Sequence, residues 1–416
     1  MHAPSRPFAP PFAAANPFRV LWRHRNFRLF WVGQTLSLVG TWMQSMARGW
    51  LALDISDSAF LVGLVSAVGA LPILLLSLPA GVLVDRTDKL RLVIAAQSLL
   101  LVEAAVLFWL TSSGHLTIGV LLGLAALDGV VLSVEIPARQ SLMVELVRRK
   151  DLPDAIALNS SGFNLARIVG PTAAAVVTAR LGIAWCFGLN AASFVAVLAG
   201  LLLIRLPDRT LEPSDAPPLH ALREGLAYVW GTPPLRTLVG LTAVYGICGI
   251  PYLTLMPVIA RDVLGAGVSG YGVLLASLGT GGLAGALFLA GPGRRLPRGA
   301  MLHVACFAFP ALLLAFAAAR GLASAGALLF LVGAAMILTN ALANGLLQSL
   351  VADAMRGRLM ALYSLVVVGL AQVAGAFGAG AVARAVGARA AVAAGAVVML
   401  LYAAGVSARR PELRRL

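Results

Sequence analysis

The stretch Gly81–Arg91, GVLVDRTDKLR, carries five charged residues among the seven from Asp85 to Arg91, although only 12% of the whole chain is charged. Apolar runs flank it: FLVGLVSAVGALPILLLSLPA at 60–80 and LVIAAQSLLLVEAAVLFWL at 92–110. A helix needs roughly 20 mostly apolar residues to cross the hydrocarbon core of a bilayer. The stretch is therefore predicted to be a short polar turn between two membrane-spanning helices.

The composition of the whole chain agrees with a membrane protein. Its 416 residues are 60% hydrophobic with a mean hydropathy of +0.90, far above soluble domains. The net charge is +15, but the basic residues lie in short connections between apolar segments, so lipid rather than nucleic acid is the expected partner. Three scattered cysteines and five scattered histidines lack metal-ligand spacing, so neither a metal nor a cofactor is expected.

Twelve spans are expected from apolar segments of sufficient length between charged or Pro/Gly-rich breaks. Their starts lie near Phe27, Ala59, Leu90, Leu116, Ala157, Ile183, Leu235, Tyr271, Ala300, Ala325, Leu359 and Ala388. The pair at 359–408 is the least distinct, because Arg384 and Arg389 interrupt an Ala/Gly/Val-rich stretch. The predicted fold class is an all-α membrane protein with two six-helix bundles.

Positive charge orients the predicted spans. Alternate connections together with both tails hold 25 of the 32 Lys and Arg residues, and the other connections hold five. Since Lys and Arg accumulate in cytoplasmic loops, both termini are expected in the cytoplasm. Five segments follow: an N-terminal tail at 1–26, a bundle at 27–206, a linker at 207–235, a second bundle at 236–408 and a C-terminal tail at 409–416. The linker part LHALREGLAYVW could form an amphipathic helix on the membrane surface.

The two halves repeat one another. QSLMVELVRR at 140–149 matches QSLVADAMRG at 348–357, ALNS at 157–160 matches ALYS at 361–364, and LARIVG at 165–170 matches LAQVAG at 370–375. The three matches keep their order at nearly one offset, although convergent use of Ala, Leu and Val could produce part of the likeness. Like-oriented halves suit a transporter with a central site that opens alternately to either side.

Several stretches resemble known transporters. GVLVDRTDKLR is similar to the loop between helices 2 and 3 of the major facilitator superfamily, with Gly81, Leu83, Asp85 and Arg86 on its pattern. The end of the stretch departs from the usual pattern. The block at 40–53, GTWMQSMARGWLAL, and the longer blocks at 136–171 and 255–282 resemble the branch that contains the enterobactin exporter.

The resemblance implies a latch in the quoted stretch. Asp85 would accept hydrogen bonds from the start of helix 11, after Arg356 and Arg358, when the cytoplasmic side closes. Arg86, Arg91 and Arg139 would complete the charge cluster. The alternative is that the charges only keep a tight turn out of lipid.

Ionisable groups within spans are costly and therefore functional candidates. They are Arg48, Glu103, Asp128, Glu135 and Arg167. Counting from helix ends near Pro137 and Asn159 places Asp128 and Arg167 at similar depth, about 13 and 12 Å at 1.5 Å per residue, and an ion pair between them is expected. The pair could only neutralise two charges, or Asp128 could titrate during transport.

The other three charges have alternative roles. Glu103 is a rival proton carrier, but a structural role is favoured because helix 3 is peripheral in the superfamily. Arg48 could snorkel or pair with Asp54, and Glu135 is expected close to the headgroups.

Helix 5 carries ARIVGPTAAA at 166–175, which resembles the antiporter signature of drug exporters at Gly170 and Pro171 but has alanines in place of its flanking glycines. This favours export. The fold of the superfamily implies that helices 1, 4, 7 and 10 face the central cavity. The candidate substrate contacts on these helices, each of which could serve packing instead, are Gln44, Met46, Tyr245, Tyr252, Asn340 and Asn344.

The sequence thus predicts a monomeric secondary transporter of a bacterial cytoplasmic membrane that exchanges protons for a small organic molecule such as a siderophore or drug. Uptake by symport and a non-transporting scaffold or receptor remain alternatives. An enzyme is not expected, and an ATP-driven pump is excluded by the lack of a GxxxxGK[ST] motif.

Overall fold

The computed structural model describes residues 18–206, 218–249, 251–352 and 355–410, and these residues form helices and short connections without a strand. The first half contains α1 (Arg19–Arg23), α2 (Arg25–Ser56), α3 (Ala59–Arg86), α4 (Lys89–Ser112), α5 (Ile118–Glu145), the 3-10 turn η1 (Arg149–Asp151), α6 (Leu152–Leu181) and α7 (Ala184–Leu202). Helix α8 (Pro218–Gly231) connects it to the second half. The described part of the predicted N-terminal tail is therefore already helical.

The second half repeats this plan with more interruptions. It contains α9 (Pro233–Gly249), α10 (Pro251–Thr254), α11 (Met256–Val258), the π-helix η2 (Ile259–Val263), α12 (Gly267–Ala290), the 3-10 turn η3 (Pro292–Arg295), α13 (Arg298–Ala318), α14 (Leu322–Leu350), α15 (Arg356–Ser364), the π-helix η5 (Leu365–Leu370), α16 (Ala371–Val386) and α17 (Ala388–Arg409). Taking α9–η2 and α15–α16 as single spans, the twelve predicted spans are present. Ten are long and apolar enough to cross a membrane on composition, whereas α2 and α6 carry too many polar residues.

Helix ends follow local chemistry. The side chains of Ser58, Asp88 and Thr117 accept backbone hydrogen bonds at the starts of α3, α4 and α5. Glycines in the left-handed region end α6 and α16, Gly182 at φ +91° and Gly387 at φ +88°. These two glycines are 205 residues apart, the offset of the sequence repeat, and Gly387 resolves the indistinct stretch at 359–408 into two helices.

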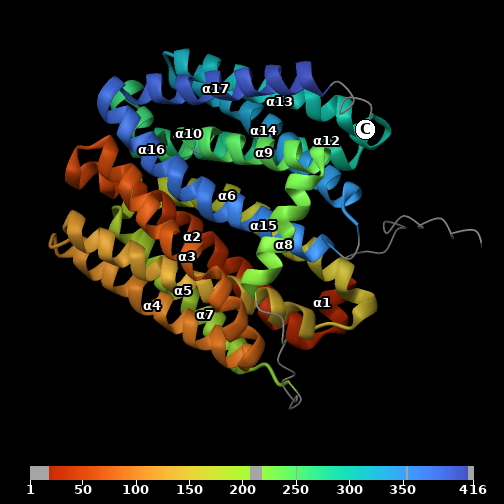
Figure 1. Cartoon of the computed structure of the whole chain (residues 1–416). Coiled ribbons are helices and arrows are strands. Elements are labelled where there is room, and N and C mark those ends of the chain that lie inside the picture. The colour runs from red at the N-terminus through yellow and green to blue at the C-terminus, as the bar shows by residue number, and fades with distance from the viewer. Residues whose placement is uncertain (1–17, 207–217, 250, 353–354, 411–416) are drawn as a thin grey trace, which may run out of the picture.

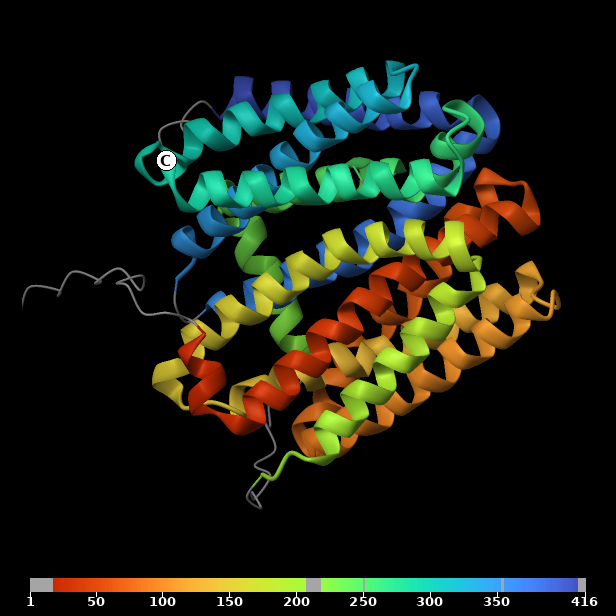
Figure 2. The same cartoon turned by 180° about the vertical axis from the view of Figure 1, so that it is seen from behind.

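The helices form two bundles that lie side by side (Figures 1 and 2). In each half the second spanning helix packs against the fourth: α3 against α5, and α12 against α14. We call the end with helix α8 and the connections 87–88, 146–151, 203–206 and 291–297 the basic end. The end with the connections 57–58, 113–117, 264–266 and 319–321 is called the opposite end.

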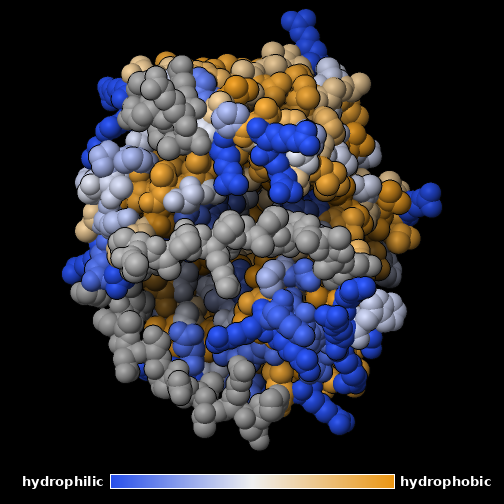
Figure 3. Space-filling model, turned by 90° about the vertical axis from the view of Figure 1, so that its right-hand side faces the viewer, coloured by the Kyte–Doolittle hydropathy of each residue, from blue (hydrophilic) through white to orange (hydrophobic). Residues whose placement is uncertain are grey.

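The two halves meet toward the opposite end. Trp50 stacks on Tyr271 with ring centroids 6.1 Å apart, and Phe60 meets Phe377 edge to face at 5.7 Å. A Cβ atom added to Gly63 would lie 2.6 Å from the Ala376 carbonyl oxygen, so α3 and α16 cross there in direct backbone contact. At the basic end the surface is hollowed between the halves (Figure 3). The structure is therefore closed at the opposite end and open at the basic end.

Candidate functional site

Three charged side chains meet inside the first bundle. Arg48 on α2 donates from Nη2 to Glu103 Oε1 on α4 at 2.9 Å and from Nη1 to Asp128 Oδ2 on α5 at 2.7 Å. The side chain of Glu103 is 2% exposed, that of Arg48 13% and that of Asp128 16%. We call these three residues the Arg48 cluster.

Amides extend the cluster across the bundle. Gln44, one turn before Arg48 on α2, donates from Nε2 to Glu103 Oε2 at 2.8 Å. Asn190 on α7 donates from Nδ2 to Gln44 Oε1 at 2.8 Å, and Ser193 donates to Asn190 Oδ1 at 3.1 Å. The connected groups therefore come from α2, α4, α5 and α7. Gln44 points into its own bundle, which corrects the prediction that it lines the central cavity.

The three charges lie at one level of the bundle. Arg48, Glu103 and Asp128 are 8, 9 and 10 residues from the opposite ends of their helices at Ser56, Ser112 and Ile118. At 1.5 Å per residue, these spacings are about 12, 14 and 15 Å. The cluster therefore lies well inside the length of the helices.

The predicted ion pair between Asp128 and Arg167 is wrong, as is the pairing of Arg48 with Asp54. Helix α5 continues through Pro137 to Glu145, so the helix end used to estimate depth was misplaced. Helix α6 packs against α2 and α12, whereas α5 packs against α3 and α4. The consecutive helices α5 and α6 are therefore not packed against one another, and α2 supplies the cation instead.

The charge balance of the Arg48 cluster allows it to hold a proton. Two carboxylates and one guanidinium carry a net charge of −1 when all are ionised, and one added proton makes the cluster neutral. Removing one partner of a buried ion pair leaves an uncompensated charge, which is strongly unfavourable. Protonation of either acid removes that excess without exposing a charge. Proton binding is therefore coupled to the ion pairs that Arg48 forms with Glu103 and Asp128.

A second buried acid lies nearer the basic end. Glu135 accepts from Arg139 Nε at 2.8 Å and from Gln97 Nε2 at 3.0 Å. It is only 3% exposed and lies 10 residues before the end of α5 at Glu145, whereas its depth relative to the lipid headgroups stays a prediction. Arg139, predicted for the latch, is held within its own helix by this pair.

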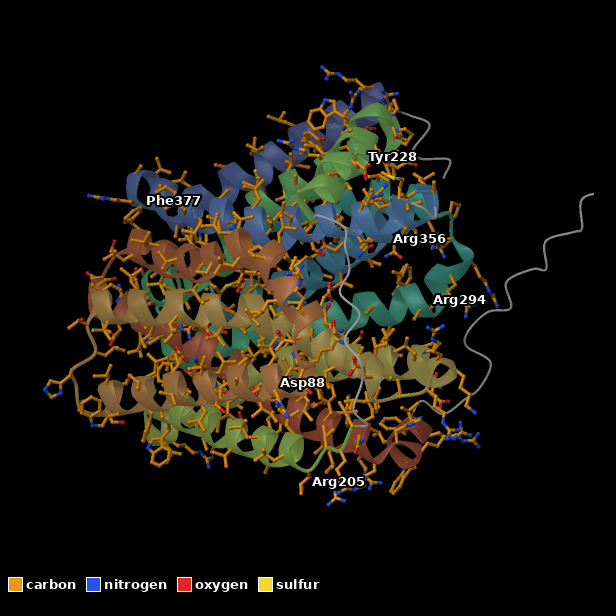
Figure 4. The ribbon with its side chains drawn as sticks, turned by 60° about the horizontal axis from the view of Figure 1, so that its bottom comes forward. Asp88, Arg205, Tyr228, Arg294, Arg356 and Phe377 are labelled. Atoms are coloured by element: carbon orange, nitrogen blue, oxygen red, sulfur yellow. The ribbon has the colours of Figure 1, made fainter. Side chains whose placement is uncertain are left out.

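The latch residues are spread over both sides of the hollow at the basic end. Asp85, Arg86 and Arg91 are exposed, and no ion pair joins Asp85 to the second half among the residues that the structure describes. Gly81 has open space where a Cβ would lie. On the other side Arg358 Nη2 pairs with Glu224 Oε2 of α8 at 3.0 Å. Figure 4 shows Asp88 and Arg356 well apart on the two halves.

The predicted cavity residues divide into buried and accessible groups. Tyr245 donates to the Cys306 carbonyl oxygen and Tyr252 donates to Met336 Sδ at 3.1 Å, so both hydroxyls are engaged inside the second bundle. Met46 is 2% exposed and packs in the core. Asn344 Oδ1 accepts from Gln348 at 2.7 Å. Of this set only Asn340 is exposed.

The Gly170–Pro171 segment brings α6 against helices of both halves. A Cβ atom added to Gly170 would lie 2.5 Å from Trp42 Cβ on α2, whereas a Cβ on Gly272 of α12 would lie 3.2 Å from the Pro171 carbonyl oxygen. The small residues of segment 166–175 predicted a close contact with the other half. This contact involves Pro171 and Ala175 rather than Gly170.

Sequence reasoning missed the contact that ties the halves at the opposite end. Arg261 of η2 pairs with Asp57 and donates from Nη1 to the Leu53 carbonyl oxygen at 3.3 Å. It also missed Gln97 and Asn190, single amides in otherwise apolar runs. Such isolated amides are a usable signal, because a polar group in lipid must find a partner on another helix.

Comparison with known proteins identifies the family. The family model described as transmembrane secretion effector matches residues 15–415. The staphyloferrin A transporter of Staphylococcus aureus is 27% identical over 264 residues, 63% of this chain and 66% of that protein. The multidrug efflux pump Tap of Mycolicibacterium fortuitum is 30% identical over 209 residues, 48% of this chain and 51% of that protein. The chain thus spans about two thirds or less of the length of these curated relatives.

Solved structures with the same fold are transporters. A bacterial homolog of the human lysosomal transporter Spinster, in an inward-facing and occupied conformation, matches with a TM-score of 0.74 at 14% identity over 97% of this chain and 99% of that one. A bacterial homologue of the iron transporter ferroportin, inward-facing, matches with a TM-score of 0.67 at 16% identity over 91% and 98%. At this identity the likeness establishes the fold.

Proposed function

We propose proton-coupled export of a small organic molecule as the function of this chain, which belongs to the transmembrane secretion effector family of the major facilitator superfamily. The relatives named for siderophore transport and for multidrug efflux support export as the direction. The observation that carries the proposal is the Arg48 cluster, two acids sharing one cation inside the first bundle.

The cluster acts on the helix that closes the opposite end. Arg48 is two residues before Trp50, which stacks on Tyr271 of the second half. The two partners of Arg261 lie at the end of the same helix: Leu53 is in the last turn of α2, and Asp57 directly follows it. A change in the ion pairs of Arg48 is therefore transmitted along helix α2 to the contacts between the two halves.

The coupling follows from the charge balance. With both acids ionised, Arg48 is held from α4 and α5, and α2 stays in place. A proton on Asp128 or Glu103 weakens one of the two ion pairs and lets α2 shift relative to that helix. Because this shift alters the closure at the opposite end, protonation biases the equilibrium between the two open states. Glu135 and Arg139 form a second site for proton transfer toward the basic end.

The direction of opening follows from the positive charge of the basic end, which we place in the cytoplasm of a bacterial cell with both termini on that side. The structure then corresponds to a state open to the cytoplasm. Asp85 meets the start of α15 when this side closes, with Arg86, Arg91 and Arg358 around it. The transporter works as a monomer, because each half supplies one wall of the pathway.

The test is flux in proteoliposomes carrying an imposed pH gradient, with staphyloferrin A, a macrolide and a panel of lipophilic drugs as probes. We expect at least one probe to move against its gradient while protons move the other way. Asp128→Asn and Glu103→Gln should abolish proton-linked flux, whereas Asp154→Asn, outside the cluster, should retain it. Co-directional movement of probe and protons would establish uptake instead, and no flux of any probe would favour a scaffold.

A further inference from the structure

The second intramembrane arginine, Arg167, lies at the boundary between the halves. It is 15 residues after the start of α6 and 14 before its end, about 21 to 23 Å from either end. Its guanidinium rests on a glycine of the other half, because a Cβ atom added to Gly282 of α12 would lie 2.8 Å from Arg167 Nη2. Figure 2 shows α6 and α12 running side by side across the boundary.

Arg167 differs from Arg48 in having no acid beside it in the described part of the chain. Among the described residues no carboxylate pairs with it and no acceptor receives a hydrogen bond from it. Its side chain is only partly buried. Burying an unpaired charge inside a membrane protein is unfavourable, and such a group is a functional candidate by default.

The described residues of the facing half do not supply the missing charge. From Pro233 onward the only acidic side chain among the described residues is Asp262, which lies at the opposite end bound to Arg261. The surroundings of Arg167 are the phenol of Tyr252, close enough to interact with its charge, and Ile337 of α14, which also approaches Gly282. Asn340, one turn beyond Ile337 toward the basic end, is exposed.

We propose that Arg167 is the recognition group for a carboxylate carried by the exported molecule, an assignment that rests on the proposed function and names its substrate class. A guanidinium presents a planar fork of donors that matches a carboxylate, and the pairing is strongest where water is scarce. Asn340 contributes an exposed amide on the basic-end side of that fork. The ligand enters from the open basic end, past Asn340.

This assignment gives substrate and proton separate sites. The Arg48 cluster lies among α2, α4 and α5, and Arg167 lies between α6 and α12. Helix α6 packs on α2 through Gly170, so the two sites bear on the same helix. An acidic substrate neutralises Arg167, and a proton neutralises the Arg48 cluster.

The experiment compares acids with their neutral amides on the full-length purified chain. The probes are 1-naphthaleneacetic acid, 4-phenylbutyric acid and tricarballylic acid, each paired with its amide, and binding is followed by tryptophan fluorescence. We expect at least one acid to bind about 10- to 100-fold more tightly than its amide, the preference that a charge-assisted pair supplies. Arg167→Gln should remove this preference and Arg167→Lys should keep part of it.

Two further variants separate recognition from folding. Gly282→Ala keeps the charge but crowds Nη2, and we expect a several-fold loss of acid affinity with little change for the amide. Arg180→Gln, on the exposed end of the same helix, should leave both affinities unchanged. The assignment is overturned if no acid binds more tightly than its amide, or if Arg167→Gln keeps the preference.

The outcome for the proposed function is read separately. An Arg167-dependent preference for acids without flux driven by a pH gradient overturns proton-coupled export and leaves the recognition site standing. Proton-coupled export of neutral molecules that is unaffected by Arg167→Gln overturns the recognition site alone.

Discussion

The two halves share one architecture but differ in what their cores contain. The first half holds the Arg48 cluster and the Glu135–Arg139 pair. The corresponding interior of the second half contains packed aromatic rings. The ring centroid of Phe309 lies 6.1 Å from that of Tyr245 and 6.3 Å from that of Tyr252. Packing alone is therefore sufficient to form such a bundle, because the second half has no buried ion pair among its described residues. The ions of the first half therefore serve another purpose.

The likeness of the halves rests on equivalent glycines. A Cβ added to Gly129 of α5 would lie 2.1 Å from the Gly69 carbonyl oxygen of α3. A Cβ added to Gly333 of α14 would lie 2.1 Å from the Leu278 carbonyl oxygen of α12. The two glycines are 204 residues apart, again the offset of the repeat.

The largest effect is expected from breaking the Arg48 cluster. Arg48→Met leaves Glu103 and Asp128 without their cation and should cost about 3–5 kcal/mol, seen as a lower thermal unfolding temperature in detergent. Tyr245→Phe removes one hydrogen bond from the second core and should cost about 1 kcal/mol.

The matched control removes all three charges together. Arg48→Met combined with Glu103→Gln and Asp128→Asn should recover most of the stability while proton-linked flux stays absent. If Arg48→Met alone is as stable as the natural chain, the result contradicts a cluster of two buried, ionised acids that depend on Arg48 for their counter-charge.

The next effect tests the likeness of the halves. Gly129→Ala and Gly333→Ala should each cost about 1–3 kcal/mol of stability, because a methyl group has no room at either crossing. Gly119→Ala and Gly345→Ala, on the same helices but in open space, should be neutral or slightly stabilising. Strongly unequal effects at Gly129 and Gly333 would contradict equivalent crossings.

A smaller effect concerns the contact that joins the halves. Arg261→Gln removes the ion pair with the exposed Asp57, worth up to about 1 kcal/mol, and should shift the population toward opening at the opposite end by up to about fivefold. The readout is the labelling rate of a cysteine replacing Ala67, buried one turn after Gly63 on α3. Exchanging the charges by Asp57→Arg with Arg261→Asp should restore the original rate, and an unchanged rate in Arg261→Gln would refute the role.

The smallest effect concerns the contact between His24 and Asp151 at the basic end of the first half. His24 Nε2 contacts Asp151 Oδ2 at 2.9 Å, and this hydrogen bond lowers the pKa of the Asp151 carboxyl below its usual range. Because the folded-state pKa is the lower one, the ionised carboxylate stabilises the fold above the unfolded-state pKa of about 3.9, and this contribution is lost as pH falls through the folded value.

The variant Asp151→Asn should therefore lower the unfolding temperature slightly at pH 7, by less than about 1 kcal/mol in free energy, and the difference should be smaller at pH 3. Asp154→Asn, three residues on, provides the comparison. An equal destabilisation by Asp151→Asn at both pH values would exclude the ionised carboxylate as its cause.

Much of the fold could be predicted from the sequence. The twelve spans, the break near Gly387 and the helix in the linker follow from apolar length, glycine and charge, which act on each segment separately. The identity of the intramembrane charges was also predictable. Their pairing was not, because Pro137 lies inside α5 and α6 packs against α2 instead of α5.

Which segments enter the membrane and where they stop can be read from the amino-acid sequence, because the cost of placing each residue in lipid depends on that residue and its helix neighbours. The packing of the helices sets the ion pairs: Arg48 holds Glu103 and Asp128, while Arg167 lies beside Gly282 with no acid near it among the described residues. Ion pairing depends on distances between helices far apart in the chain. Those distances are set by how whole helix faces pack, and no short stretch of sequence encodes them.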